Sequence, residues 1–167
     1  LAVWHMNEPV SGGVVTDSTG NGHDGAFSTG NDIAITDGAV GDAYVFDGDE
    51  QIAVPDANDL DITDTVHLEA WANPTATASS YKYILVKGTT TSPYSLRASS
   101  CCMPDLSGMH IRNSGIGLSA TLPSHIPAGQ WTHLTGSFDF TGDATPRVHQ
   151  DGGAAVVGNN ASGSAMI

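Results

Sequence analysis

The 167-residue sequence predicts an all-β protein, an antiparallel sandwich of two sheets, and three observations support this class. Short apolar runs are separated by clusters of Gly, Pro, Asn, Asp, Ser and Thr, and the 20 glycines are typical of a chain with many turns. Several of the runs alternate apolar and polar residues. No window of about 12 residues has the apolar period of about 3.6 residues that marks an amphipathic helix.

The first predicted strands lie before residue 55. Ala2–Met6 precedes a stretch with Pro and Gly, Tyr44–Phe46 leads into the dipeptide Asp47-Gly48, and Gln51–Val54 follows. An Asp-Gly pair between two apolar runs favours a tight turn. We therefore expect Tyr44–Phe46 and Gln51–Val54 to pair as a hairpin.

The clearest alternation is in Val66–Ala72. The apolar residues at 66, 68 and 70 share one face, and His67, Glu69 and Trp71 share the other. Pro74 ends this predicted strand because a proline has no N–H to donate to a sheet.

The second half of the chain continues the pattern. Tyr83–Lys87 and Tyr94–Ala98 form a second predicted hairpin, and Trp131–Phe138 places Leu134, Gly136 and Phe138 on one face. A third predicted pair joins Arg147–Gln150 to Ala154–Val157 across the turn Asp151-Gly152, whereas residues 121–130, with two prolines, are expected to be a loop. We find no repeat and no dividing linker, so we expect residues 1–167 to form a single domain.

The charge is strongly negative. Eighteen acidic residues face five basic ones, for a net charge of −13. Such a surface repels nucleic acid and anionic membranes, which are bound through Lys and Arg. No segment approaches the roughly 18 apolar residues of a membrane span, so we expect no membrane insertion. Three explanations of the excess Asp remain open, namely turn residues, a surface adapted to salt, and oxygen ligands for Ca²⁺.

The two cysteines, Cys101 and Cys102, are adjacent in the sequence. No Cys/His spacing predicts a zinc site. Outside the cytoplasm these thiols can close a vicinal disulfide or reach another chain, and the alternative is a pair of reduced, partly buried residues. We expect a disulfide.

Several stretches together resemble the laminin-G-like domains of the concanavalin A-like lectin/glucanase jelly-roll family. These stretches follow one another in the order of the family pattern across nearly the whole chain: Asp17–Gly25 preceded by Trp4, Tyr44–Gly48 with Ile52–Pro55, Leu60–Thr63 with Leu68–Trp71, Ile84–Gly88, and Trp131–Leu134 with Val148–Gly152.

The resemblance implies a jelly roll whose members bind sugars, proteins or lipids, or act as spacers beside catalytic domains. It also implies that Trp4, Trp71 and Trp131 are mostly core residues. The family pattern continues past the last Asp-Gly turn, so the resemblance predicts a sandwich that is incomplete at its C-terminus. We therefore expect this domain to be part of a longer chain or to be completed by a strand of a neighbouring chain.

The Asp17–Gly25 loop is rich in oxygen-bearing side chains. In relatives this loop lies near a Ca²⁺ site that is completed around the Phe-Asp-Gly turn and by an acidic residue near the C-terminus. The resemblance therefore implies Asp17, Asn21 and Asp47 as metal ligands. The alternative is that Asp17 and Asn21 cap a turn through hydrogen bonds to the backbone.

A sugar-binding face would need exposed aromatic rings with hydrogen-bonding groups beside them. Tyr81, Tyr83 and Tyr94 lie on or beside the second predicted hairpin, and Arg112 and Asn113 lie on a following strand. We expect these five residues to form the ligand-binding group, and the alternative for the tyrosines is ordinary packing within the sandwich.

Catalysis is not expected. Hydrolases of this broad fold carry paired acids, mainly Glu, on one strand, and the three Glu residues of this chain are widely separated. Nucleophile elbows and phosphate-binding loops are absent from the sequence. Asn160 heads a three-residue sequon, Asn160-Ala161-Ser162, which predicts glycosylation in a secreted protein.

Two functions follow from these features. The first is an extracellular or cell-surface module that binds a glycan and is stabilised by Ca²⁺. The second is a structural or adhesive subunit of a surface layer or filament, which assembles with other chains or with copies of itself through strand edges. Glycan arrays and light scattering separate the two.

Overall fold

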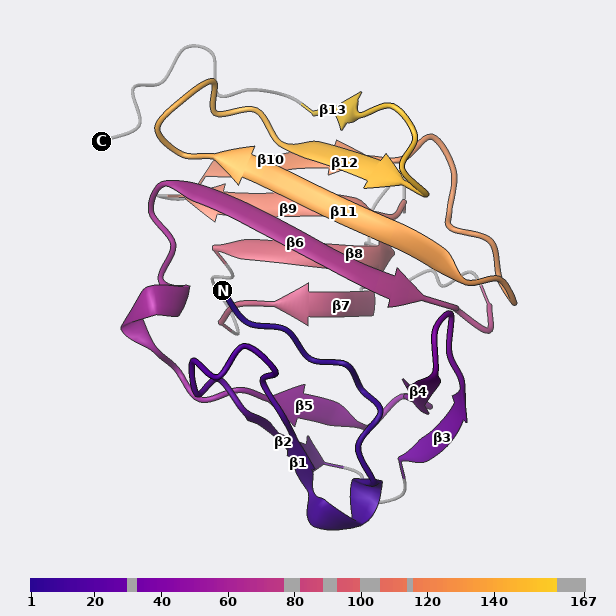
Figure 1. The fold of residues 1–167 in the computed structure, drawn as a ribbon. Coiled ribbons are helices and arrows are strands. Elements are labelled where there is room, and N and C mark those ends of the chain that lie inside the picture. The colour runs from indigo at the N-terminus through magenta and orange to yellow at the C-terminus, as the bar shows by residue number, and fades with distance from the viewer. Residues whose placement is uncertain (30–32, 77–81, 89–92, 100–105, 114–115, 159–167) are drawn as a thin grey trace. The chain divides into compact units, whose positions relative to one another are not determined.

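The computed structural model describes residues 1–29, 33–76, 82–88, 93–99, 106–113 and 116–158. The chain divides into two compact units, Leu1–Asp61 and Ile62–Ile167, and each is described by itself. Strands dominate both units, and the helices found in the described ranges are two 3₁₀ turns, η1 (Val10–Gly12) and η2 (Asn58–Leu60) (Figure 1). The all-β prediction is confirmed, whereas the single-domain organisation stays a prediction.

Two four-stranded antiparallel sheets make up the second unit. One sheet has the order β13-β12-β11-β6 and the other has the order β10-β9-β8-β7, and they lie one over the other (Figure 1). The strands are β6 (Thr65–Ala72), β7 (Lys82–Val86), β8 (Tyr94–Ser99), β9 (Gly108–Asn113), β10 (Ile116–Thr121), β11 (Thr132–Asp139), β12 (Arg147–Gln150) and β13 (Val156–Val157).

The core of this unit lies between the two sheets. In β11 every second residue is buried from Thr132 to Phe138, and β6, paired with it over eight residue pairs, buries Val66 and Leu68. The opposite sheet contributes Leu96 and Met109, both fully buried. The alternation predicted for Val66–Ala72 and Trp131–Phe138 is therefore confirmed, and it is what separates an inward face from an outward face on each sheet.

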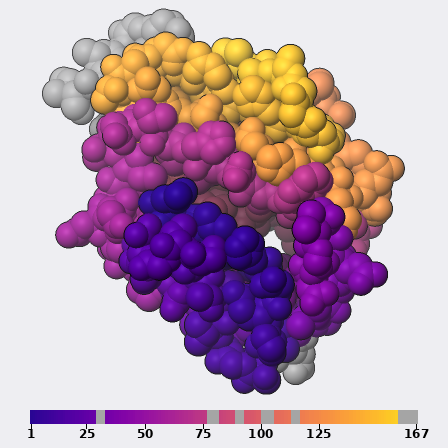
Figure 2. Space-filling model, viewed as in Figure 1, coloured from indigo at the N-terminus to yellow at the C-terminus, as the bar shows by residue number. Residues whose placement is uncertain are grey.

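The two sheets approach closely where β11 crosses β9. A methyl group at Gly136 would lie 2.8 Å from Met109 Sδ and 3.0 Å from Met109 Cβ. Glycine at this position leaves room for the methionine side chain. The outward side of the β6–β11–β12–β13 sheet faces the viewer in Figure 1, and its magenta, orange and yellow atoms form the upper surface in Figure 2.

The first unit holds two smaller antiparallel sheets. One has the order β1-β2-β5 and the other pairs β3 with β4, and the strands are β1 (Val14–Val15), β2 (Gly25–Thr29), β3 (Ala34–Asp37), β4 (Asp42–Val45) and β5 (Gln51–Ala53). Its own apolar cluster is centred on Val15, Ile33 and Tyr44, and the rings of Phe27 and Tyr44 meet edge to face at 5.5 Å.

The hairpin predictions have mixed outcomes. β7 pairs with β8 and β12 pairs with β13, as predicted. The expected pairing of Tyr44–Phe46 with Gln51–Val54 is wrong, because β4 pairs with β3 and β5 pairs with β2. The backbone N–H groups of Asp47 and Gly48 donate to Glu50 Oε2, at 2.7 and 3.1 Å, so a side chain shapes this turn in place of a backbone ladder.

The N-terminal segment also differs from its prediction. Within Ala2–Met6 the only β-pairing recorded for these described residues is an isolated bridge between Trp4 and Asp17. Met6 has a φ of 59°, a left-handed conformation that interrupts an extended run. Instead of a strand, this segment is an irregular stretch that hydrogen bonds of the Asp17 and Trp4 side chains join to residues 17–23.

The approach of β11 to β9 makes a testable prediction. We expect Gly136→Ala to lower the free energy of unfolding by about 1–3 kcal/mol, because the added methyl group overpacks the core against Met109. Urea unfolding followed by circular dichroism measures the change. Gly117→Ala on β10 is the control, since its nearest neighbour would be His110 Nε2 at 3.5 Å. Equal stability of both variants would contradict the close approach.

Candidate functional site

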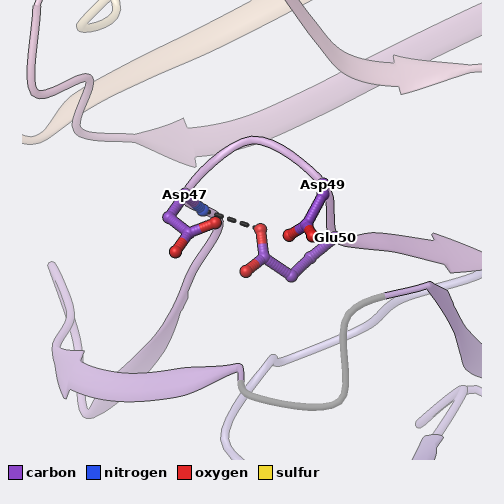
Figure 3. Close-up of side chains that lie close together, drawn as sticks. All are labelled: Asp47, Asp49 and Glu50. Atoms are coloured by element: carbon purple, nitrogen blue, oxygen red, sulfur yellow. Dashed lines mark hydrogen bonds between the residues drawn. The ribbon is translucent and has the colours of Figure 1, made fainter.

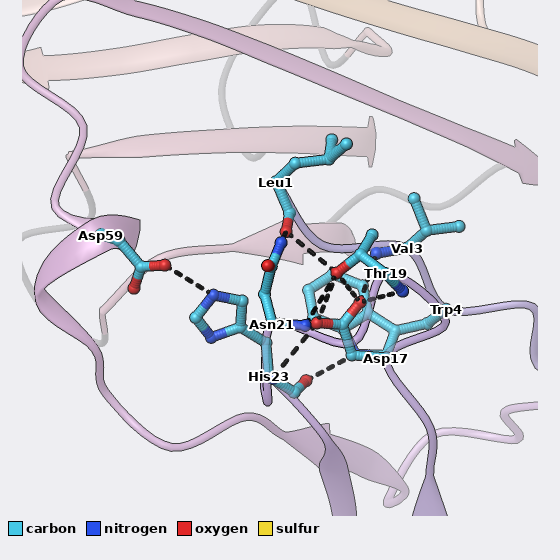
Figure 4. A network of polar contacts seen from close by, with 8 residues as sticks. All are labelled: Leu1, Val3, Trp4, Asp17, Thr19, Asn21, His23 and Asp59. Atoms are coloured by element: carbon cyan, nitrogen blue, oxygen red, sulfur yellow. Dashed lines mark hydrogen bonds and ion pairs between the residues drawn. The ribbon is translucent and has the colours of Figure 1, made fainter.

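Asp17 is the centre of a hydrogen-bond network in the first unit (Figure 4). Its side chain is 4% exposed. Oδ1 accepts hydrogen bonds from the backbone N–H of Val3 at 3.0 Å and of Thr19 at 3.1 Å, and Oδ2 accepts one from the N–H of His23 at 3.2 Å. The Thr19 hydroxyl lies 2.7 Å from Oδ1 and 2.9 Å from Oδ2. The carboxylate therefore joins the N-terminal segment to the 17–25 loop.

Neighbouring contacts extend the network. Trp4 Nε1 donates to the His23 carbonyl at 2.8 Å, and Asn21 Nδ2 donates to the Leu1 carbonyl at 2.8 Å. His23 Nε2 lies 2.9 Å from Asp59 Oδ2, which connects the loop to η2 (Figure 4). Asp17 thus caps the turn through hydrogen bonds from the backbone, as the alternative to metal binding predicts. A metal role for Asp17 and Asn21 stays a prediction.

The pKa of Asp17 reflects these contacts. Burial by itself raises the pKa, but the hydrogen bonds from Val3, Thr19 and His23 outweigh it and hold the pKa well below its ordinary value of 3.8. The carboxylate is therefore charged at neutral pH and its oxygens already have donors. A cation at Asp17 would have to displace some of these hydrogen bonds.

A second acidic group lies in the turn between β4 and β5 (Figure 3). Asp47, Asp49 and Glu50 each offer an oxygen, and these oxygens lie within 4.8 Å of one another. The hydrogen bond and the charge of Glu50 raise the pKa of Asp47, as expected where like charges converge. Among the described residues this is the group that could hold a metal ion, and of the three predicted ligands it contains only Asp47.

The sheet β10-β9-β8-β7 brings aromatic and cationic side chains together on its outward face. Tyr83 on β7 is 45% exposed and pairs with Arg97 on β8. The Arg97 guanidinium lies over the Tyr83 ring at 5.0 Å, and its Nε donates to Ser95 Oγ at 3.1 Å. Because Arg97 is held from two sides, it fixes the ring in place while leaving much of it exposed to solvent.

The other residues predicted to bind a ligand differ in whether they are exposed, buried or outside the described residues. Arg112 on β9 is exposed and shares the outward face, because Ile111 beside it lies in the core. Tyr94 does not have the exposure expected of a ligand-binding residue. It is 5% exposed and packs in the core, because its side chain leaves the sheet on the side opposite to that of Ser95. Asn113 ends β9, its side chain is not described, and Tyr81 lies outside the described residues.

Sequence reasoning missed an exposed aromatic pair on the outward side of the opposite sheet. Trp71 on β6, expected in the core, is 52% exposed, and its ring lies 5.0 Å from that of His133 on β11. His133 Nε2 is 4.0 Å from Glu69 Oε2 and His67 Nε2 is 3.8 Å from the same oxygen. The strand alternation was the available signal, because it places Trp71 opposite the core face.

Two further predictions fall outside the described residues. They concern the disulfide of Cys101 and Cys102 and the glycosylation of Asn160. No helix in the described ranges is long and apolar enough to span a membrane.

Comparison with known proteins gives two matches. The family model described as the concanavalin A-like lectin/glucanases superfamily matches residues 46–165. Domain 4 of AbnA, a GH43 extracellular arabinanase from Geobacillus stearothermophilus solved in complex with arabinotriose, has a similar structure. The TM-score is 0.67 at 23% identity, and the alignment covers 87% of this chain and 69% of that one. No curated protein matches the chain.

The Asp17 network makes a prediction about pH. A carboxylate whose pKa is lowered on folding stabilises the fold fully above its ordinary pKa of 3.8, and this stabilisation is lost as the pH falls towards the folded-state value. We therefore expect Asp17→Asn to lower the Tm at pH 7, and the difference from wild type to narrow below about pH 4. Thermal melts across pH measure this. Asp37→Asn, an exposed change on β3, should show no such narrowing.

Proposed function

The chain belongs to the concanavalin A-like lectin/glucanase superfamily, and on this premise we propose that it is a non-catalytic, extracellular module that binds a glycan. The binding surface of this proposal is the outward face of the β7–β10 sheet, which we call the Tyr83 face. It is defined by the exposed Tyr83 and Arg112, the half-buried His110, and the buried Ser95 and Arg97 on the same side of the sheet. The extracellular location rests on the description of the structural neighbour.

The observation that carries the proposal is the half-exposed ring of Tyr83 held by Arg97. Sugar rings present C–H faces that pack on aromatic rings, and their hydroxyl groups accept and donate hydrogen bonds. A ring whose position is already fixed loses little conformational freedom on binding. That the structural neighbour was solved with arabinotriose supports an oligosaccharide as the class of ligand.

The absence of catalysis is part of the proposal. Hydrolysis of a glycosidic bond uses a pair of carboxyl groups on either side of the bond. Strands β7 to β10, as far as they are described, contain neither Asp nor Glu. The Tyr83 face therefore offers groups that bind a sugar without the acids that would cleave it.

We also propose that Ca²⁺ binds at Asp47, Asp49 and Glu50. Their converging oxygens fit the preference of Ca²⁺ for carboxylate ligands, and a cation would relieve the repulsion that raises the pKa of Asp47. Asp17 fits less well because hydrogen bonds occupy both of its oxygens. Bound calcium would stabilise the turn that leads into β5 and take no part in a reaction.

A structural or adhesive role is the second candidate, and the outward face of β6 favours it. Trp71 is half-exposed and stacked on His133, and exposed aromatic residues are common at protein interfaces. Under this proposal the partner is another protein chain, including further copies of this one.

Paired aromatic variants separate the two surfaces. We expect Tyr83→Ala to weaken glycan binding about tenfold, equivalent to about 1.4 kcal/mol, because the stacking ring is lost. Trp71→Ala is the matched control, since Trp71 is 52% exposed, against 45% for Tyr83, and lies on the other sheet of the same unit. Titration calorimetry with a ligand found on a glycan array measures both.

The opposite pattern would move the binding surface to β6. A second outcome would favour the structural role: no array glycan binds, and light scattering shows an assembly that dissociates in the Trp71→Ala variant.

The calcium proposal has its own test. We expect added Ca²⁺ to raise the Tm of the wild-type protein and EDTA to reverse the rise, since a ligand that binds the folded state stabilises it. The double variant Asp47→Asn/Asp49→Asn should lose the response, and Asp17→Asn should keep it. Loss of the response in Asp17→Asn alone would assign the metal to the 17–25 loop instead.

A further inference from the structure

Charge is distributed very unevenly along this chain. Residues 1–69 contain 14 of the 18 acidic residues and none of the basic ones. Residues 70–138 contain four of the five basic residues and one acidic residue, Asp105, which lies outside the described ranges. A chain with a net charge of −13 therefore has one segment with an excess of positive charge.

The fold concentrates that segment on the Tyr83 face. Arg97 lies between the core residues Leu96 and Ala98 in sequence, and Arg112 follows the core residue Ile111, so both side chains leave the sheet on the outward side. Lys82, exposed at the start of β7, pairs with Ser99, two residues from Arg97. Three neighbouring strands thus bring three cations to one face of the sheet. Lys82 and Arg97 lie beside Tyr83, whereas Arg112 lies further along the sheet, where its backbone N–H donates to the Pro93 carbonyl at 3.0 Å.

The cations differ in what they can do. Arg97 is 8% exposed and fixed over the Tyr83 ring, so it supplies a stationary positive charge below the surface. Arg112 is exposed and, in the described part of the chain, forms no ion pair with an acidic side chain, so its guanidinium can reach a ligand. A guanidinium matches a carboxylate through two parallel hydrogen bonds.

His110 lies on the same face, paired with Ser95. Burial and the charges of Arg97 and Arg112 lower its pKa to about 4, so the ring is neutral at pH 7. His110 therefore adds no charge at neutral pH, and the attraction for an anion comes from the exposed Arg112 and Lys82.

We propose that the glycan bound by the Tyr83 face is an acidic oligosaccharide, with the carboxylate of one uronic acid paired to Arg112 and another of its sugar rings stacked on Tyr83. This inference rests on the proposed glycan-binding function and narrows its ligand. Screening explains how an acidic chain can bind an acidic sugar. Charges in salt solution act over about 8 Å at physiological ionic strength, and strands β7 to β10, as far as they are described, contain cations but neither Asp nor Glu.

The size of the ligand follows from the same balance. A short oligosaccharide needs only the cations of this sheet, whereas a long polyanion is repelled by the net charge of −13. We therefore expect short uronic acid oligomers to bind, and long nucleic acids to be repelled.

Calorimetry with three oligosaccharides tests this inference. The probes are trigalacturonate, which carries only carboxylates, a sulfated galactan trisaccharide, which carries only sulfate esters, and neutral arabinotriose. We expect the wild-type protein to bind trigalacturonate at least about tenfold more tightly than either of the others, and raised NaCl to weaken this binding. Tighter binding of the sulfated probe or of arabinotriose would overturn the inference while leaving glycan binding in place.

Arginine variants locate the interaction. We expect Arg112→Gln to lose the preference for trigalacturonate, and Arg112→Lys to regain part of it, because lysine keeps the charge without the paired hydrogen bonds. Arg147→Gln is the control, since Arg147 lies on β12 in an ion pair with Asp143 and should be unaffected. An equal loss in both Gln variants would overturn the assignment to the Tyr83 face. Failure of every array glycan to bind would instead overturn the proposed function itself.

Discussion

The antiparallel pairing of β6 with β11 is the interaction on which the second unit depends. Eight residue pairs hold these strands in one register, and in that register Val66, Leu68, Leu134 and Phe138 all face the opposite sheet. A shift by one residue would turn the core side chains to solvent and bury His67, Glu69 and Trp71. The same register therefore decides both where the core lies and which side chains remain available to a ligand or partner.

The first unit is stabilised in a different way. Its strands are short, and the N-terminal segment is joined to the 17–25 loop by Asp17, which accepts hydrogen bonds from Val3, Thr19 and His23. Here the hydrogen bonds that one buried carboxylate accepts hold two segments together, whereas in the second unit backbone hydrogen bonds between strands do so. Because an unpaired buried carboxylate is costly, the donors around Asp17 and the conformation of the loop depend on each other.

Charge segregation links the fold to the proposed chemistry. Acidic residues gather in the first 69 positions, where turns are frequent, and cations gather on β7, β8 and β9. Neither the net charge nor any single motif reveals this contrast. The net charge of −13 argues against nucleic acid as a partner, yet it does not indicate that basic residues gather on one sheet.

Much of the second unit could be predicted from the sequence, because alternation and turn dipeptides are local signals that act within a strand or hairpin. They identified the inward faces of β6 and β11 and the pairs β7–β8 and β12–β13. The pairing of β4 with β3 and of β5 with β2, the burial of Tyr94 and the exposure of Trp71 were not predicted correctly. The sequence by itself determined the all-β class and the two-faced strands. Only the tertiary structure decided which strands are neighbours, and hence that Tyr83, Arg97 and Arg112 share a face, because such contacts join residues far apart in the chain.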